Sequence, residues 1–227
     1  METWTVRRIV AWMQADFTQR GIDSPRLDAD LLVAHVLGVK RLALFLDPDR
    51  PLVDAELTQI RALVARRRAR EPIAYILGER EFYGRSFRVT RDVLIPRPDT
   101  EVLVDEAKRF LAGAPEGAVL DVCTGSGAVG VTLAAECAGR QVVVSDVSAE
   151  ALAVAADNAA RLDLGARLEA RRGDLFAVVG EGERFACITI NPPYIGQVEL
   201  PDLMPEVRRR RRPAPARQTR AKTTYVS

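Results

Sequence analysis

Short apolar segments alternate with helix-like segments along the second half of this chain. The expected strands and helices cover residues 118–122, 128–137, 141–145, 149–161, 167–171 and 185–190, the second and fourth being helices. Strands that alternate with helices of this length form a parallel, doubly wound sheet, because each helix packs back onto the strands it connects. The sequence therefore predicts an α/β fold with a mostly parallel sheet.

The first part of the chain has a different pattern, which predicts helices. Apolar residues recur at helical spacing near the start, at Val6, Ile9, Val10, Met13 and Phe17. Ser24 and Pro25 indicate the start of a second helix, which stops at Gly38. Asp54 is expected to cap a further helix that runs to about Arg70.

One face of that further helix is rich in arginine. Its basic residues are Arg61, Arg66, Arg67, Arg68 and Arg70. Charged residues on one face of a helix are typical of a surface exposed to solvent, and we adopt this interpretation. His35 is the only histidine of the chain, and we assign no chemistry to it.

Changes of pattern divide the chain into four expected parts. Residues 1–78 form a small helical domain, and residues 79–95 form a β-hairpin linker. The sheet domain spans residues 96–207, and residues 208–227 form a basic tail. The tail holds eight of the 33 Lys and Arg residues and no acid, which leaves the part before it with 25 basic and 31 acidic residues. That part therefore lacks the clustered positive charge of a broad nucleic-acid-binding face.

The cysteines and the apolar runs limit the class of protein further. Cys123, Cys137 and Cys187 are far apart and form no cluster with metal-ligand spacing. We expect no metal site, and we expect buried free thiols in a reducing compartment. No apolar run reaches the length of a membrane span, and the N-terminus lacks the apolar core of a signal peptide. These features predict a soluble, cytoplasmic monomer.

Polar residues fall at the carboxyl ends of the expected strands. They are Asp121, Asp146, Asp174 and Asn191. Ligands of open α/β sheets bind beyond the carboxyl ends of the strands, at the point where the strand order reverses. The sequence therefore predicts that these four segments form one site.

A glycine-rich loop, Cys123-Thr124-Gly125-Ser126-Gly127, connects the first of these strands to its helix. Glycines there let the backbone approach a ligand closely and direct a helix N-terminus toward it. This arrangement predicts a cofactor site.

Two cofactors fit that loop. Gly125, Gly127 and Gly130 match a dinucleotide fingerprint with Asp146 at the ribose position, which favours an NAD-binding dehydrogenase. Asp121 would repel a pyrophosphate and suits the cationic amino-acid group of S-adenosylmethionine, whose ribose would also fit Asp146. The second cofactor implies a methyltransferase.

The segment Asn191-Pro192-Pro193-Tyr194 follows the last expected strand. Its prolines donate no backbone hydrogen bond and hold the neighbouring carbonyls rigidly. The asparagine amide offers both donors and an acceptor, and the tyrosine ring offers a flat wall. Such a pocket suits a planar group that bears an NH2, either a carboxamide or the exocyclic amine of a base.

Up to about Arg208 the chain resembles the release factor glutamine methyltransferases, the PrmC/HemK family. The matching segments are Ser24–Gly38, Glu71–Phe87, Val93–Glu101, Leu120–Gly127 and Asn191–Tyr194. The helical part and the sequence Ile-Pro-Arg-Pro-Asp-Thr-Glu are specific to this family. Asn-Pro-Pro-Tyr is shared with DNA adenine methyltransferases, which remain an alternative.

The resemblance implies a Rossmann-like class I methyltransferase fold and transfer of a methyl group from S-adenosyl-L-methionine, with S-adenosyl-L-homocysteine as product. The acceptor would be the side-chain amide nitrogen of the glutamine in the Gly-Gly-Gln motif of class I peptide chain release factors, recognised by the helical domain. The implied cofactor residues are Asp121, Cys123, Thr124, Gly125, Ser126, Gly127, Asp146, Asp174, Leu175 and Asn191. The implied substrate pocket is Asn191, Pro192, Pro193 and Tyr194, and the implied catalytic residues are Asn191, Pro192 and Tyr194. Cys123 departs from the family's usual glycine, and Leu175 departs from its usual large residue.

The resemblance stops at the basic tail. Arg208 to Arg212 are consecutive arginines, and a Pro/Ala/Arg/Thr-rich segment follows them. We interpret the tail as foreign sequence on a truncated or frame-shifted product, which would lack the last strands of the sheet and be poorly active. A basic arm that binds nucleic acid or the ribosome is the alternative.

Overall fold

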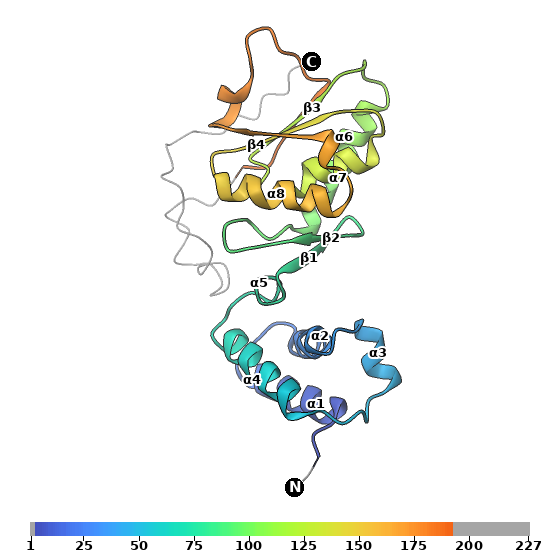
Figure 1. The fold of residues 1–227 in the computed structure, drawn as a ribbon, viewed down its shortest axis with the longest axis vertical. Helices are drawn as coiled ribbons and strands as arrows, with labels where there is room; N and C mark the ends of the chain where they lie inside the picture. The colour runs from blue at the N-terminus through green and yellow to red at the C-terminus, as the bar shows by residue number, and fades with distance from the viewer. Residues whose placement is uncertain (1–2, 193–227) are drawn as a thin grey trace.

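The computed structural model describes residues 3–192 of the 227-residue chain. Figure 1 shows a helical region at one end and a sheet with its helices at the other. The helical region contains α1 (Val6–Gln19), α2 (Pro25–Leu37), α3 (Arg41–Leu46), α4 (Asp54–Arg68) and α5 (Ile73–Leu77). It has its own apolar core, in which Met13, Phe17, Leu32, Val33 and Ile60 are fully buried.

The expected helices of this region are confirmed, with differences at their ends. Helix α2 stops at Gly38, whose φ of +64° lies in the left-handed region that glycine adopts without strain. The residue that caps α4 is Val53, and the expectation of Asp54 was wrong. The Glu56 carboxylate accepts the Val53 N–H at 3.0 Å, so the cap comes from inside the helix.

The arginine face of α4 is only partly a solvated surface: Arg61 and Arg68 are exposed, so the interpretation holds for them and is wrong for Arg67. Arg67 is buried, and its Nε donates to Asp28 Oδ2 on α2 at 2.7 Å. Arg66 donates to both oxygens of Glu71, in each case at 2.8 Å. Arg67 therefore connects α4 to α2, and Arg66 connects α4 to the short segment that leads into α5.

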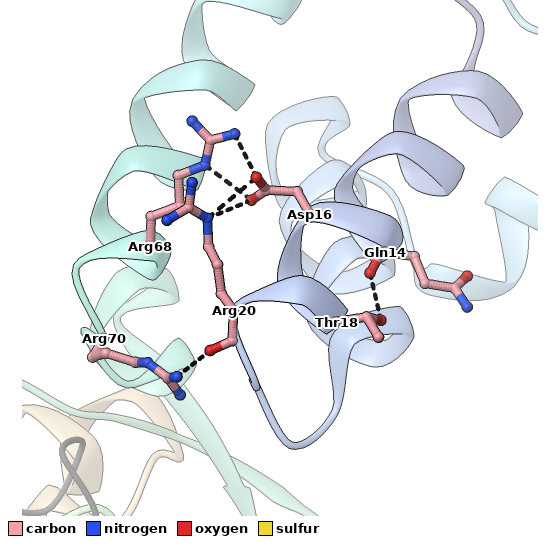
Figure 2. Close-up of polar contacts among 6 residues, drawn as sticks. All are labelled: Gln14, Asp16, Thr18, Arg20, Arg68 and Arg70. Atoms are coloured by element: carbon pink, nitrogen blue, oxygen red, sulfur yellow. Dashed lines mark hydrogen bonds and ion pairs between the residues drawn. The ribbon is translucent and has the colours of Figure 1, made fainter.

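Arginines near the end of α4 also bind the end of α1 (Figure 2). Arg68 donates two hydrogen bonds to the Asp16 carboxylate, at 2.8 and 2.9 Å, and Arg20 donates to the same group at 3.2 Å. Arg70 donates to the Arg20 carbonyl and, at 2.9 Å, to the Gly21 carbonyl. The C-terminal turn of α4 is therefore tied to the C-terminal turn of α1.

A β-hairpin follows the helical region, as expected. Its strands β1 (Glu79–Phe82) and β2 (Arg85–Arg88) pair antiparallel. Phe82 and Phe87 are buried and meet edge to face, with ring centroids 6.0 Å apart. They join the apolar core of the sheet region, so the hairpin belongs to that region by packing.

The sheet region begins with a 3-10 turn at Pro98–Thr100. Its elements are α6 (Glu101–Leu111), β3 (Val119–Val122), α7 (Ala128–Glu136), β4 (Val142–Asp146), α8 (Ala149–Arg161), β5 (Leu168–Arg172) and β6 (Cys187–Ile190). These agree with the expected helices and strands to within two residues. All the strand pairs are parallel, and the strand order is β5-β4-β3-β6.

The strand order reverses between β3 and β6. The chain moves from β3 to β4 to β5 and then returns to pair β6 with the other side of β3. Helices α6, α7 and α8 lie on one face of the sheet (Figure 1), and residues 175–185 pack against Leu120, Val122 and Val143 on the other. Ligands of such sheets bind where the order reverses, beside the carboxyl ends of β3 and β6.

Among residues 3–192, no helix is long and apolar enough to cross a membrane. In the same range, no cluster of His, Cys, Asp and Glu side chains could hold a metal ion. Pro193, Tyr194 and the whole basic tail lie outside the described residues.

Candidate functional site at the carboxyl end of the sheet

The glycine loop turns sharply as it leaves β3. Three of its residues have left-handed backbone angles, with φ of +58° at Cys123, +57° at Gly125 and +80° at Gly127. A non-glycine residue with such a φ is uncommon, so a glycine at the position of Cys123 would adopt this backbone angle with less strain. The Thr124 N–H donates to the Ser145 carbonyl at 3.0 Å, so the loop is also fixed to β4.

The three glycines of the fingerprint have different roles. A Cβ on Gly130 would lie 2.5 Å from Val144 Cγ1, and a Cβ on Gly127 would lie 2.9 Å from the Ala155 Cβ. These two glycines allow α7 to pack closely on β4 and α8. A Cβ on Gly125 would meet no atom within 4 Å, so this glycine is on the open side of the loop.

Asp121 lies inside β3 and is only 2 % exposed, so its carboxylate does not face the open edge as expected. Its Oδ2 accepts the Thr124 hydroxyl at 2.6 Å and the Gly130 N–H at 3.0 Å. Its Oδ1 accepts the Thr189 hydroxyl on β6 at 2.8 Å. The carboxylate thus connects the glycine loop, α7 and β6 from behind the site.

Burial dominates the protonation of two groups here. It raises the pKa of Asp121 to about 6 despite the three hydrogen bonds to the carboxylate. Burial, followed by the charges of Asp146, Asp121 and Asp174, raises the pKa of the Cys123 thiol to about 11. Cys123 therefore stays a thiol at neutral pH and is not a nucleophile. All three cysteines are free and half-buried, so they are less buried than expected.

Asp146 is the last residue of β4 and faces the loop. Its Oδ2 accepts the Gly125 N–H and its Oδ1 accepts the Ser148 N–H, both at 3.0 Å. Each carboxylate oxygen retains a second lone pair for a ligand hydroxyl. The Asp146 carbonyl also accepts the Gly173 N–H at 3.1 Å, which brings exposed Asp174 and half-buried Leu175 to the same edge.

Asn191 follows β6 directly. In the sheet, Val122 pairs with Ser145 on one side and with Ile190 on the other. The residues that follow these three strand positions, Cys123, Asp146 and Asn191, therefore lie at the same edge of the sheet. Asn191 Nδ2 lies 3.5 Å from Thr100 Oγ1, a long hydrogen bond that orients the amide. With Nδ2 as donor on that side, Oδ1 is the acceptor of this side chain.

The residues that support the loop are hard to recognise from the sequence. Asn158 is 1 % exposed on α8, and its Nδ2 donates to the Ser126 carbonyl at 2.9 Å and to the Arg88 carbonyl at 3.0 Å. A single asparagine among the alanines of α8 is the only sequence signal for it. Thr189 and Thr100 carry no signal, because their partners are distant in the sequence.

Two family models match the chain. Residues 8–78 match the PrmC N-terminal domain, and residues 99–204 match the methyltransferase small domain. A solved structure of a tRNA (uracil-54, C5)-methyltransferase from Pyrococcus abyssi is 18 % identical with a TM-score of 0.42, covering 58 % of this chain and 30 % of that one.

Curated relatives match over almost the whole chain. The release factor glutamine methyltransferase of Geobacter sulfurreducens is 44 % identical over 91 % of this chain and 71 % of the relative. The protein of the same name from Rhodopirellula baltica is 40 % identical over 90 % of this chain and 71 % of the relative. By this identity and coverage, the chain belongs to the release factor glutamine methyltransferase family.

Proposed function

We propose that this protein transfers a methyl group from S-adenosylmethionine to the side-chain amide nitrogen of the glutamine in the Gly-Gly-Gln motif of class I release factors. The observation that carries the proposal is the 44 % identity to a release factor glutamine methyltransferase over 91 % of the chain. The geometry supports it, because Asn191 and the glycine loop lie at the same edge of the sheet.

The residues at that edge fit S-adenosylmethionine. The loop from Cys123 to Gly127 would hold its amino-acid part, since the side of Gly125 is open and the N-terminus of α7 lies behind it. Asp146 would bind the ribose hydroxyls through its remaining lone pairs, and Asp174 with Leu175 would lie beside the adenine. Asp121 would not contact the cofactor but would hold the loop in place through Thr124 and Gly130. When bound, this cofactor supplies an electrophilic methyl group on a sulfonium.

The chain's own contribution is to orient the amide. An amide nitrogen is a poor nucleophile because its lone pair is delocalised, so its alignment with the methyl group matters most. Asn191 Oδ1 and the Pro192 carbonyl would accept the two amide hydrogens and stabilise the positive charge that develops on nitrogen. The proton then leaves to water. Pro193 and Tyr194 would complete the pocket.

Replacing Asn191 tests this mechanism. We expect Asn191→Ala to lower kcat by on the order of a hundredfold, because one aligned acceptor of the transition state is lost. Binding of S-adenosylmethionine, measured by calorimetry, should change much less. Thr100→Val is the matched control, since it removes only the orienting contact and should lower kcat less. An Asn191→Ala enzyme with normal turnover would remove Asn191 from the mechanism.

Calorimetry also tests the cofactor. We expect binding of S-adenosylmethionine and S-adenosylhomocysteine, and we expect Asp146→Ala to weaken both. Preference for NAD would instead support the dehydrogenase alternative.

The net charge of residues 1–207 favours a protein substrate over duplex DNA. Residues 1–207 carry six more acidic than basic residues, which disfavours a duplex DNA substrate despite the shared Asn-Pro-Pro-Tyr segment. We infer a monomer that acts on a release factor and does not bind nucleic acid through this body. Labelled cofactor incubated with each substrate tests this inference, and label in DNA alone would favour the adenine methyltransferase alternative.

A further inference from the structure

A cavity of about 280 Å³ lies where the helical region meets the sheet region. Its walls come from the start of α5, from β1 and from the segment before α6, and Figure 1 shows α5 and β1 between the two regions. It is lined by Pro72, Ile73, Ala74, Arg80, Ile95, Pro96, Arg97, Pro98 and Asp99. None of these residues has a role in the cofactor site.

Two hydrogen bonds connect the cavity wall at Arg97 to Asn191. Pro96 and Pro98 fix the backbone on either side of Arg97, and the Thr100 N–H donates to the Arg97 carbonyl at 3.0 Å. Thr100 in turn holds the Asn191 amide. A polypeptide whose glutamine reaches Asn191 therefore has a short path along this wall to the cavity.

Two arginines give the cavity its donors. Arg80 Nε is buried and has no hydrogen-bond partner among residues 3–192, although buried polar atoms are normally paired. Arg97 also lines the cavity and is exposed. A guanidinium has only donors, so the complementary groups of a ligand are oxygen acceptors.

The remaining polar residue narrows the class of ligand. The Asp99 carboxylate would repel a phosphate or another compact anion, yet it can accept an N–H. A polypeptide main chain offers carbonyl acceptors and N–H donors at short intervals, so it matches arginine and aspartate together. On the proposed function, the residues beside the target glutamine are glycines, which present only main-chain groups for recognition.

We propose that this cavity binds the main chain of the substrate loop beside the methylated glutamine, with Arg80 and Arg97 donating to its carbonyl oxygens. The inference rests on the proposed function and adds the site that holds the substrate backbone. It assigns to Arg80 and Arg97 a role in substrate binding that is separate from cofactor binding and from the Asn191 pocket.

The test measures binding of a full-length class I release factor to the 227-residue chain by calorimetry in the presence of S-adenosylhomocysteine. We expect Arg80→Met and Arg97→Met each to raise the Kd for the release factor about tenfold, the effect of losing one charge-assisted hydrogen bond. The Kd for S-adenosylhomocysteine should stay the same, as should kcat at saturating release factor. Arg61→Met, on the exposed side of α4, is the matched control and should change neither Kd.

Three results would overturn the inference. One is a double variant, Arg80→Met with Arg97→Met, that binds the release factor as tightly as the unmodified chain. Another is a parallel loss of S-adenosylhomocysteine binding, which would assign the arginines to the cofactor site. The third is an Arg97→Met effect that vanishes when acidic side chains of the release factor loop are neutralised, which would assign the arginine to a carboxylate.

Failure of the proposed function would look different. In that case the unmodified chain would neither bind nor methylate the release factor, and both proposals would fall together. Because Arg97 is exposed, its variant is expected to fold normally, and a thermal melt checks this for both variants.

Discussion

The helical region and the sheet region each contain a largely buried carboxylate, and the two regions treat it differently. In the helical region, hydrogen bonds from Arg66 and then Arg91 lower the pKa of Glu71 to about 2. In the sheet region, burial raises the pKa of Asp121 to about 6, because its partners are neutral hydroxyls and one N–H. The helical region thus uses arginine to hold segments together, whereas the carboxylate of Asp121 has no cation partner among residues 3–192.

The chain contains separate probes for the two regions. Its two tryptophans, Trp4 and Trp12, both lie in the helical region, with ring centroids 6.4 Å apart. Its three cysteines all lie in the sheet region. Tryptophan fluorescence and thiol labelling therefore follow unfolding of each region separately, and the predictions below use this difference.

The largest effect is expected from breaking the buried ion pair of the helical region. Arg67→Met leaves the Asp28 carboxylate buried without its cation, which typically costs about 3–5 kcal/mol. Urea unfolding followed by tryptophan fluorescence should show this loss, while thiol labelling of the sheet region changes little.

The control for this prediction removes both charges. Asp28→Leu combined with Arg67→Met should recover most of the loss, because no buried charge is left unpaired. A loss below about 1 kcal/mol in the single variant would mean that the pair behaves like an exposed salt bridge, and our comparison of the regions would be wrong.

The next largest effect is expected in the pH dependence of the folding stability of the sheet region. An aspartate in an unfolded chain ionises near pH 4, so between about pH 4 and 6 the folded state holds the Asp121 proton more tightly. The contribution of this group to stability is therefore greatest below pH 4 and falls as the pH rises to 6, by on the order of 3 kcal/mol.

Thiol labelling with an acid-active pyridyl disulfide measures this dependence. Asp121→Asn cannot ionise, so its stability should lack the decline between pH 4 and 6, and the difference between the two proteins isolates the contribution of Asp121. Parallel pH profiles of the two proteins would contradict the raised pKa.

Packing under the glycine loop gives a smaller effect. Gly130→Ala would place a Cβ 2.5 Å from Val144 Cγ1 and is expected to destabilise the sheet region by about 1–3 kcal/mol. Gly125→Ala is the control, because its Cβ meets open space and only the left-handed backbone angle is strained, at about 1 kcal/mol. Equal losses in thiol-labelling stability would show that α7 does not depend on this close contact.

The smallest effect is the acid response of the helical region. The pKa of Glu71 is depressed, so its contribution to stability is present above about pH 4.5 and is lost as the pH falls toward 2. Because Arg66 and Arg91 are 40 % and 76 % exposed, solvent screening limits this contribution to about 1 kcal/mol. Tryptophan fluorescence of Glu71→Gln should show a weaker acid dependence than the unmodified chain, and an unchanged one would contradict the assignment.

The sequence predicted most of the sheet region and less of the helical region. Strands and helices from 118 to 190 have strong periodicity, and the positions of Asp146 and Asn191 follow from where strands end. The burial of Asp121 depends on the pairing of β3 with β6, 68 residues away, which no local pattern reveals. The arginines of α4 likewise meet partners up to 52 residues distant. Helices α3 and α5 have 6 and 5 residues, which is too short for a helical period to show.

The most direct test of the central claim is mass spectrometry of a class I release factor after incubation with this chain and S-adenosylmethionine. We expect one added methyl group on the side-chain nitrogen of the glutamine in its Gly-Gly-Gln motif. The same incubation with Asn191→Ala should leave this glutamine largely unmodified. If this glutamine gained no methyl group with the wild-type chain while duplex DNA became methylated, the protein would not be a release factor methyltransferase.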